Sequence, residues 1–150
     1  MKRPSQAVED HLRQLSIICF AILSGVALFA GVVWYLVNVA GFSPSTNLPA
    51  MLPLLANILA LVIILKALFL PRFRPPPGPG APEEAMLGWH KTNTIIGFAL
   101  REAAAFIALM AVLLTGEQTG GFAMAALAVV SMVLAWPKAE QLETTSTTPS

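Results

Sequence analysis

Charged residues and cysteine are both scarce in this chain of 150 residues. Asp, Glu, Lys and Arg make up only 11% of it, whereas soluble domains carry about 25%. The one cysteine, Cys19, lies within an apolar run, which excludes an internal disulfide and a cysteine-based metal site. The net charge of +1 gives no indication of a nucleic-acid partner, and we predict none.

Motifs that carry enzyme chemistry are absent as well. The sequence contains no Ser/His/Asp arrangement, no HExxH, no CxxC and no phosphate-binding loop. His90 has no second histidine or carboxylate at ligand spacing along the chain, so we predict no metal site and interpret His90 as an interfacial residue. We therefore expect a protein that is not an enzyme and has no cofactor.

Long apolar runs are what the sequence has instead, since 56% of its residues are hydrophobic. A helix needs about 20 apolar residues to cross a bilayer core about 30 Å thick. The first run has 23 residues, too many for the core of a cleaved signal, which has about 7 to 15. These runs predict an all-α membrane protein, a single bundle of four transmembrane helices: Leu15–Val37, Ala50–Leu70, Thr92–Thr115 and a last span of about residues 121–136.

Three polar segments frame the predicted bundle. Residues 1–14 form a short arm, and residues 137–150 are predicted to be a disordered tail. Between the second and third spans lies Pro71–Ala85, a Pro/Gly-rich linker that favours an extended spacer, with binding to a proline-recognition partner as the alternative. Aromatic residues near the span ends are typical of membrane interfaces: Trp34, Tyr35, Trp89 and Trp136, with His90 beside them.

The basic residues predict an orientation. Cytoplasmic loops of membrane proteins are enriched in Lys and Arg. Every Lys and Arg outside the centre of a span lies in or beside the arm, the Pro-rich linker or the tail, and the other two loops have none. Both termini and the linker are thus predicted to be cytoplasmic, in a multi-pass protein of a bacterial inner membrane. The basic residues that support this orientation are Lys2, Arg3, Arg13, Lys66, Arg72, Arg74, Lys91 and Lys138.

The third span carries two adjacent charges near its middle. Arg101 would lie about 14 Å into the membrane at 1.5 Å per residue, where a charge costs at least about 2.5 to 3.5 kcal/mol. Arg101 shares a small-residue sector of the helix with Gly97, Ala104 and Ala108, while Glu102 lies about 100° away. We expect both charges to face protein or water and not lipid.

Each predicted span offers a polar side chain at a similar depth. The pattern predicts a buried polar layer or an ion site made of Ser24, Asn57, Arg101, Glu102 and Ser131. We expect Asn57 to hydrogen-bond Arg101 or Glu102. In the alternative, Ser24 and Ser131 bond the carbonyl groups of their own helices.

The first and third spans are similar to each other. Ser16–Leu36 aligns without gaps on Thr94–Leu114, an offset of 78 residues, which places Arg13 opposite Lys91 and Ser24 opposite Glu102. This indicates two duplicated helical hairpins, and parallel repeats of this kind occur in transporters. Seven aligned pairs are identical: Ile17/Ile95, Ile18/Ile96, Phe20/Phe98, Ala21/Ala99, Ala27/Ala105, Ala30/Ala108 and Leu36/Leu114.

A motif in the third span resembles a known family. Ile96-Gly97-x-Ala99-Leu100-x-Glu102-Ala103-x-Ala105, followed by Ala108-Leu109 and Leu113-Leu114, resembles the carboxylate-bearing helix of the ring subunit c (proteolipid) of rotary ATP synthases. The resemblance implies that Glu102 binds a proton or a sodium ion. Arg101 and the glycine-free run Ala50–Leu70 depart from that family's pattern. The whole chain also resembles small four-helix bacterial membrane proteins.

Two functions follow from these patterns. The first is a non-enzymatic structural or accessory subunit in the lipid bilayer, which assembles with a second copy or another membrane subunit through small-residue faces. The alternative is an ion- or proton-binding transport module in which Glu102 is the site. A third function, an intramembrane enzyme, finds no motif in the sequence to support it.

Overall fold

Four helices make up the regular structure in the computed structural model, which describes residues 6–43, 48–78 and 80–137. They are α1 (Gln6–Asn38), α2 (Leu52–Phe73), α3 (Glu83–Thr115) and α4 (Gln118–Leu134), so the all-α prediction is confirmed. The first three are long and apolar enough to cross a membrane, whereas α4 is a shorter apolar helix of 17 residues. The predicted tail lies outside the described residues, apart from Pro137.

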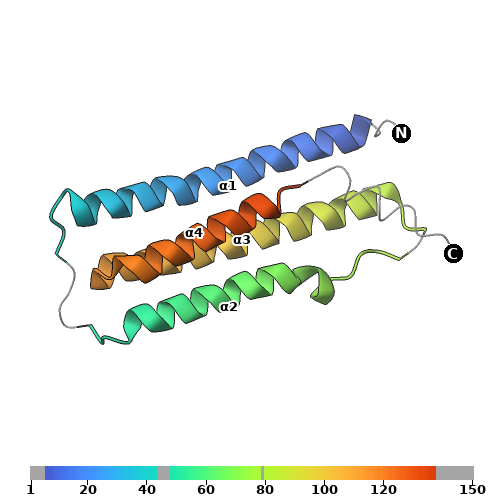
Figure 1. The fold of residues 1–150 in the computed structure, drawn as a ribbon. Helices are drawn as coiled ribbons and strands as arrows, with labels where there is room; N and C mark the ends of the chain where they lie inside the picture. The colour runs from blue at the N-terminus through green and yellow to red at the C-terminus, as the bar shows by residue number, and fades with distance from the viewer. Residues whose placement is uncertain (1–5, 44–47, 79, 138–150) are drawn as a thin grey trace.

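Helix α3 is the centre of the bundle (Figure 1). It contacts each of the other three helices, whereas α1 and α2 do not contact each other within the described residues. Helix α1 runs parallel to α3, while α2 and α4 run antiparallel to it (Figure 1). Half of the apolar stretch of α3 is buried, compared with 17% for α1 and for α2, which leaves the outer helices largely open to their surroundings.

The helix ends follow from local chemistry. Proline in the first turn of α2 is harmless because the N–H groups there have no partner within the helix. Gly116 ends α3 in a left-handed conformation with φ of 76° and donates its N–H to the Val112 carbonyl at 2.8 Å. Glu117 caps α4, because its carboxylate accepts the Gly120 N–H at 3.1 Å. Only two residues therefore separate α3 from α4.

Several helix boundaries differ from the predicted spans. Helices α1 and α3 begin at Gln6 and Glu83, inside the predicted polar arm and linker. Acidic residues in the first turn stabilise both starts through the helix dipole: Glu9 in α1, and Glu83 and Glu84 in α3. The last helix ends at Leu134 and not at Trp136, ahead of Pro137, a residue type that cannot continue a helix.

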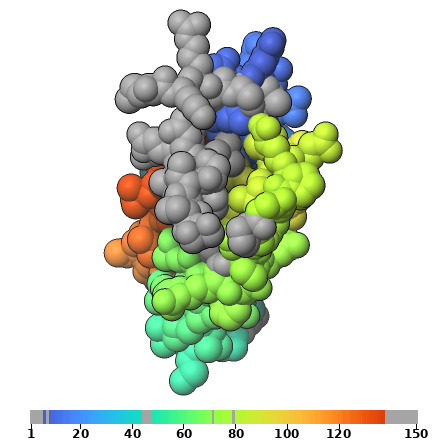
Figure 2. Space-filling model, turned by 90° about the vertical axis from the view of Figure 1, so that its right-hand side faces the viewer, coloured from blue at the N-terminus to red at the C-terminus, as the bar shows by residue number. Residues whose placement is uncertain are grey.

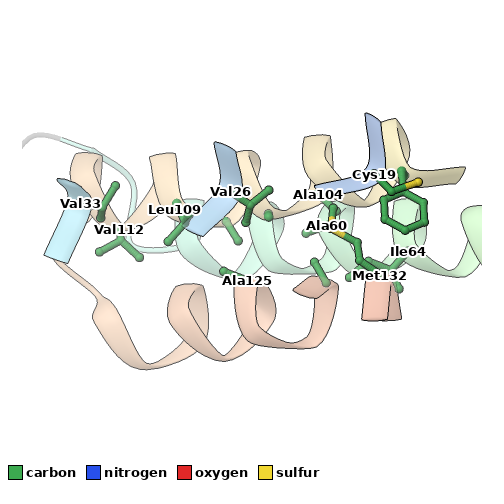
Figure 3. Packing of buried hydrophobic residues seen from close by; sticks show 14 of the residues in the cluster. Cys19, Val26, Val33, Ala60, Ile64, Ala104, Leu109, Val112, Ala125 and Met132 are labelled. Carbon is green, nitrogen blue, oxygen red and sulfur yellow. The ribbon is translucent and has the colours of Figure 1, made fainter. Parts of the chain in front are cut away.

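The core runs along α3 and takes side chains from all four helices (Figure 3). At the α3–α4 seam the contact residues are small, and Gly121 marks the closest approach. A Cβ atom on Gly121 would collide with the Val112 side chain and lie 2.9 Å from the Ala108 carbonyl oxygen. The backbones of α3 and α4 are thus in direct contact, as in membrane helix pairs that pack through small residues.

Large apolar side chains cover the outside of α1 and α2. Phe20 and Leu28 on α1 are 64% and 73% exposed, and Leu54 on α2 is 61% exposed. In Figure 2, which faces the end of the bundle, α2 forms the lower part of the surface. Soluble monomers rarely expose apolar patches this extensive, so these faces suit contact with lipid.

Candidate functional site: the charged pair of the central helix

Arg101 lies inside the bundle on the small-residue face of α3. It is 5% exposed, and Gly97, Ala104 and Ala108 of the same face are buried too, as the helical periodicity predicts. Its Nη1 donates to the Gly97 carbonyl at 2.9 Å, and its Nε is buried without a hydrogen-bond partner. A Cβ on residue 97 would lie 3.0 Å from Nη1, so glycine there leaves room for the guanidinium group.

Glu102 faces a different neighbour, helix α1. Its Oε1 would lie 3.6 Å from a Cβ atom on Gly25, and the residue is half-buried. Within the described residues the Glu102 carboxylate has no hydrogen bond, and it forms no ion pair with Arg101. Adjacent residues on a helix point in different directions, so α3 directs its two charges to different sides.

The predicted hydrogen-bond partner of this pair lies elsewhere. Asn57 faces α4, where its Nδ2 would lie 2.6 Å from a Cβ on Gly120, and its Oδ1 is buried without a partner. The prediction that Asn57 bonds Arg101 or Glu102 is wrong. Asn57 is five residues from the start of α2, about 7.5 Å, whereas Arg101 is fourteen residues from the same end of the bundle on α3, about 21 Å.

The serines show how a hydroxyl group is accommodated in this bundle. Ser131 is buried and donates to the Ala128 carbonyl of its own helix at 2.7 Å, which is the alternative outcome for that residue. Ser24 is half-buried on α1, directly before Gly25. No hydrogen bond among the described residues joins Ser24, Asn57, Arg101, Glu102 and Ser131 to one another.

Helices α1 and α3 pack in the register of the internal repeat. Gly25 meets Glu102, the Phe29 ring lies 4.9 Å from the Phe106 ring in an edge-to-face arrangement, and His11 lies beside His90. The residue numbers in these pairs differ by 77, 77 and 79, close to the offset of 78 between the aligned spans. Corresponding parts of the two similar segments therefore lie side by side.

The two histidines form a second polar cluster, which sequence spacing alone missed. The rings of His11 and His90 have centroids 5.9 Å apart and are tilted by 52°. They are far apart in the sequence, but the repeat offset places His90 opposite position 12, and this signal could have found the pair. No group of three or more His, Cys, Asp or Glu side chains with metal-binding geometry occurs in the described part of the chain.

The predicted interfacial aromatics have different environments. Trp34 and Tyr35 are each 54% exposed near the end of α1, as expected of residues that contact headgroups. Trp89 donates its Nε1–H to the Arg74 carbonyl at 3.1 Å, which ties the start of α3 to the end of α2. Trp136 packs its ring against buried Phe98, with centroids 6.2 Å apart.

Comparison with known proteins returned no match to a family model, a curated protein or a solved structure. The class of protein is therefore defined by the fold and the candidate site alone. They describe a helical bundle with three helices of membrane-crossing length, in which the central helix carries the only charges far from a helix end among the described residues.

Proposed function

We propose that this chain is a multi-pass protein of a bacterial inner membrane in which all four helices cross the bilayer. Its termini and Pro-rich linker face the cytoplasm. Support comes from the basic residues, because Arg13, Lys66, Arg72, Arg74 and Lys91 all belong to the end where α1 and α3 begin and α2 ends. Helix α4 is about 25 Å long at 1.5 Å per residue and lies along α3, so it crosses beside its neighbour.

Within that membrane the protein acts as a non-enzymatic structural or accessory subunit. One observation carries this proposal: Arg101 is enclosed between helices and bonded to the Gly97 carbonyl, so it serves packing and not a substrate. Glu102 contacts α1 of the same chain at Gly25. The proposed Arg–Glu polar layer thus consists of two charges at one level of α3 that point to different sides, with Glu102 toward α1, and it helps to set how the neighbouring helices pack on α3. The partners are the lipid bilayer and a second copy or another membrane subunit.

Charge-removing variants test the structural role. Arg101 and Glu102 form no direct ion pair, so any compensation between them acts through space. Glu102→Gln leaves Arg101 as the one charge in the middle of α3, without an opposite charge on the next residue, which is costly. Arg101→Leu leaves a carboxylate that can take up a proton, and the double variant leaves no charge. The folded yield in detergent should therefore fall most for Glu102→Gln, less for Arg101→Leu and least for the double variant. Single variants that match the unmodified protein, with no gain in the double variant, would contradict the proposal.

The alternative function is an ion- or proton-binding transport module with Glu102 as the site. It is favoured by the carboxylate of Glu102, which is half-buried and has no hydrogen-bond or ion-pair partner in the described structure. The same variants separate the two functions. In a transport module, Glu102→Gln would fold with normal yield and lose only proton or ion binding.

A further inference from the structure

The chain has two histidines, and the fold brings them together. His11 comes from the first turns of α1 and His90 from the first turns of α3, at the end of the bundle where both helices begin (Figure 1). His90 is 8% exposed. His11 is half-buried, and its Nε2 atom is buried without a hydrogen-bond partner. A buried ring nitrogen without a partner is costly unless something binds it.

We propose that His11 and His90 together bind one divalent transition-metal ion of the class that prefers imidazole nitrogen, such as Zn²⁺. Two imidazoles that each bind one zinc ion at about 2.0 to 2.1 Å have ring centroids roughly 5 to 6 Å apart, depending on the angle at the metal. The observed separation of 5.9 Å lies at the upper end of that range, so the rings would move together by roughly 0.7 Å to reach a tetrahedral angle at the metal.

Water completes the coordination, because the described residues supply no third His, Cys, Asp or Glu ligand. Two protein ligands make a site weaker than a closed structural zinc site, which has four. The charge of Lys91, which acts on His11, weakens it further because it repels a cation. The site is therefore one that fills and empties with the concentration of the metal ion.

The bound ion would add a direct link between α1 and α3 at the end where both helices begin. Helix α1 contacts α3 and α4 but not α2 in the described structure, and no short loop connects α1 to α3. A metal ion held by one ligand from each helix adds its binding free energy to the folded state. The ion therefore ties the start of α1 to α3 and makes the stability of this seam depend on metal.

The test measures thermal unfolding of the full chain in detergent, with any polyhistidine tag removed. Saturating Zn²⁺ should raise the unfolding midpoint by about 3 to 6 °C, whereas Mg²⁺, which prefers oxygen ligands, should not. The rise should disappear in His11→Gln and in His90→Gln. Lys91→Met should bind Zn²⁺ more tightly than the unmodified chain, because one repelling charge is gone.

Equilibrium binding of Zn²⁺ provides a second readout that does not depend on the stability of a variant. One ion should bind per chain, and none at this affinity should bind to His11→Gln, whose side chain is only half-buried and whose loss the fold should tolerate. Thr92→Ala, an exposed change on the same turn of α3, is the matched control and should bind normally. No binding to the unmodified chain, or binding to either histidine variant as tight as to the unmodified chain, would overturn the proposal.

Discussion

The α3–α4 seam and the α1–α3 seam are packed with side chains of different size. In the first, two helices joined by two residues approach until Gly121 lies against the backbone of α3. In the second, two parallel helices far apart in sequence meet through Phe29, Phe106 and the histidine pair. At Gly121 the first seam has no space for an added atom, whereas the second includes larger side chains and holds the half-buried Glu102.

This difference assigns different roles to the two seams. Steric fit between small residues gives α3–α4 a single arrangement, because interiors this closely packed do not deform continuously. Helix α1 has fewer neighbours and carries most of its apolar surface outward. We therefore expect the α3–α4 pair to form the rigid part of the bundle and α1 to be the helix whose attachment can be adjusted.

The largest effect should follow from filling the tight seam. Gly121→Ala adds a Cβ that collides with the Val112 side chain and lies 2.9 Å from the Ala108 carbonyl oxygen. Overpacking of this kind costs about 1 to 3 kcal/mol, measured as the free energy of unfolding in mixed detergent. Gly31→Ala in α1 is the control, since nothing lies within 4 Å of its Cβ position, and it should be neutral or stabilising by about 0.5 to 1 kcal/mol. Equal changes in the free energy of unfolding for Gly121→Ala and Gly31→Ala would contradict the proposed difference between the two seams.

A smaller effect is expected at the aromatic contact of the open seam. The edge-to-face pair of Phe29 and Phe106 should couple by about 0.5 to 1.5 kcal/mol in a double-mutant cycle with alanine. Phe20→Ala provides the comparison, because Phe20 is 64% exposed on α1 and should show no coupling to Phe106. A Phe29–Phe106 coupling near zero would mean that α1 does not seat in this register.

The sequence predicted where the helices lie along the chain better than it predicted which helices pack against each other. Apolar runs locate membrane-length helices, because length and hydropathy are properties of the segment itself. Apolar runs did not locate the starts of α1 and α3, because Gln6 and Glu83 lie in polar sequence, where hydropathy does not indicate a helix. The error at Asn57 arose mainly because its depth and that of Arg101 were counted from opposite ends of the bundle, in spans of different length. Taking Ala50 as the start of α2, which the structure places at Leu52, added only about 3 Å.

Side-chain partners were the least predictable feature. The helical wheel correctly placed Arg101 among small residues and Glu102 on another face. It could not show that Arg101 would bond the Gly97 carbonyl, or that Glu102 would meet a glycine on α1. Those outcomes depend on which helices are neighbours and how they are shifted along each other. The internal repeat was the one sequence feature that carried such information, since its offset matches the α1–α3 register.

The most direct test of the account is the location of three exposed positions relative to the membrane. In a Cys19→Ala background, single cysteines replace Ser43 after α1, Gly78 in the linker and Thr119 at the start of α4. A maleimide that cannot cross the inner membrane should label the Ser43 and Thr119 positions in cells with a permeable outer membrane. It should label the Gly78 position only after the inner membrane is opened. Labelling of Gly78 from outside, or protection of Thr119, would contradict a bundle in which all four helices cross the membrane with cytoplasmic termini.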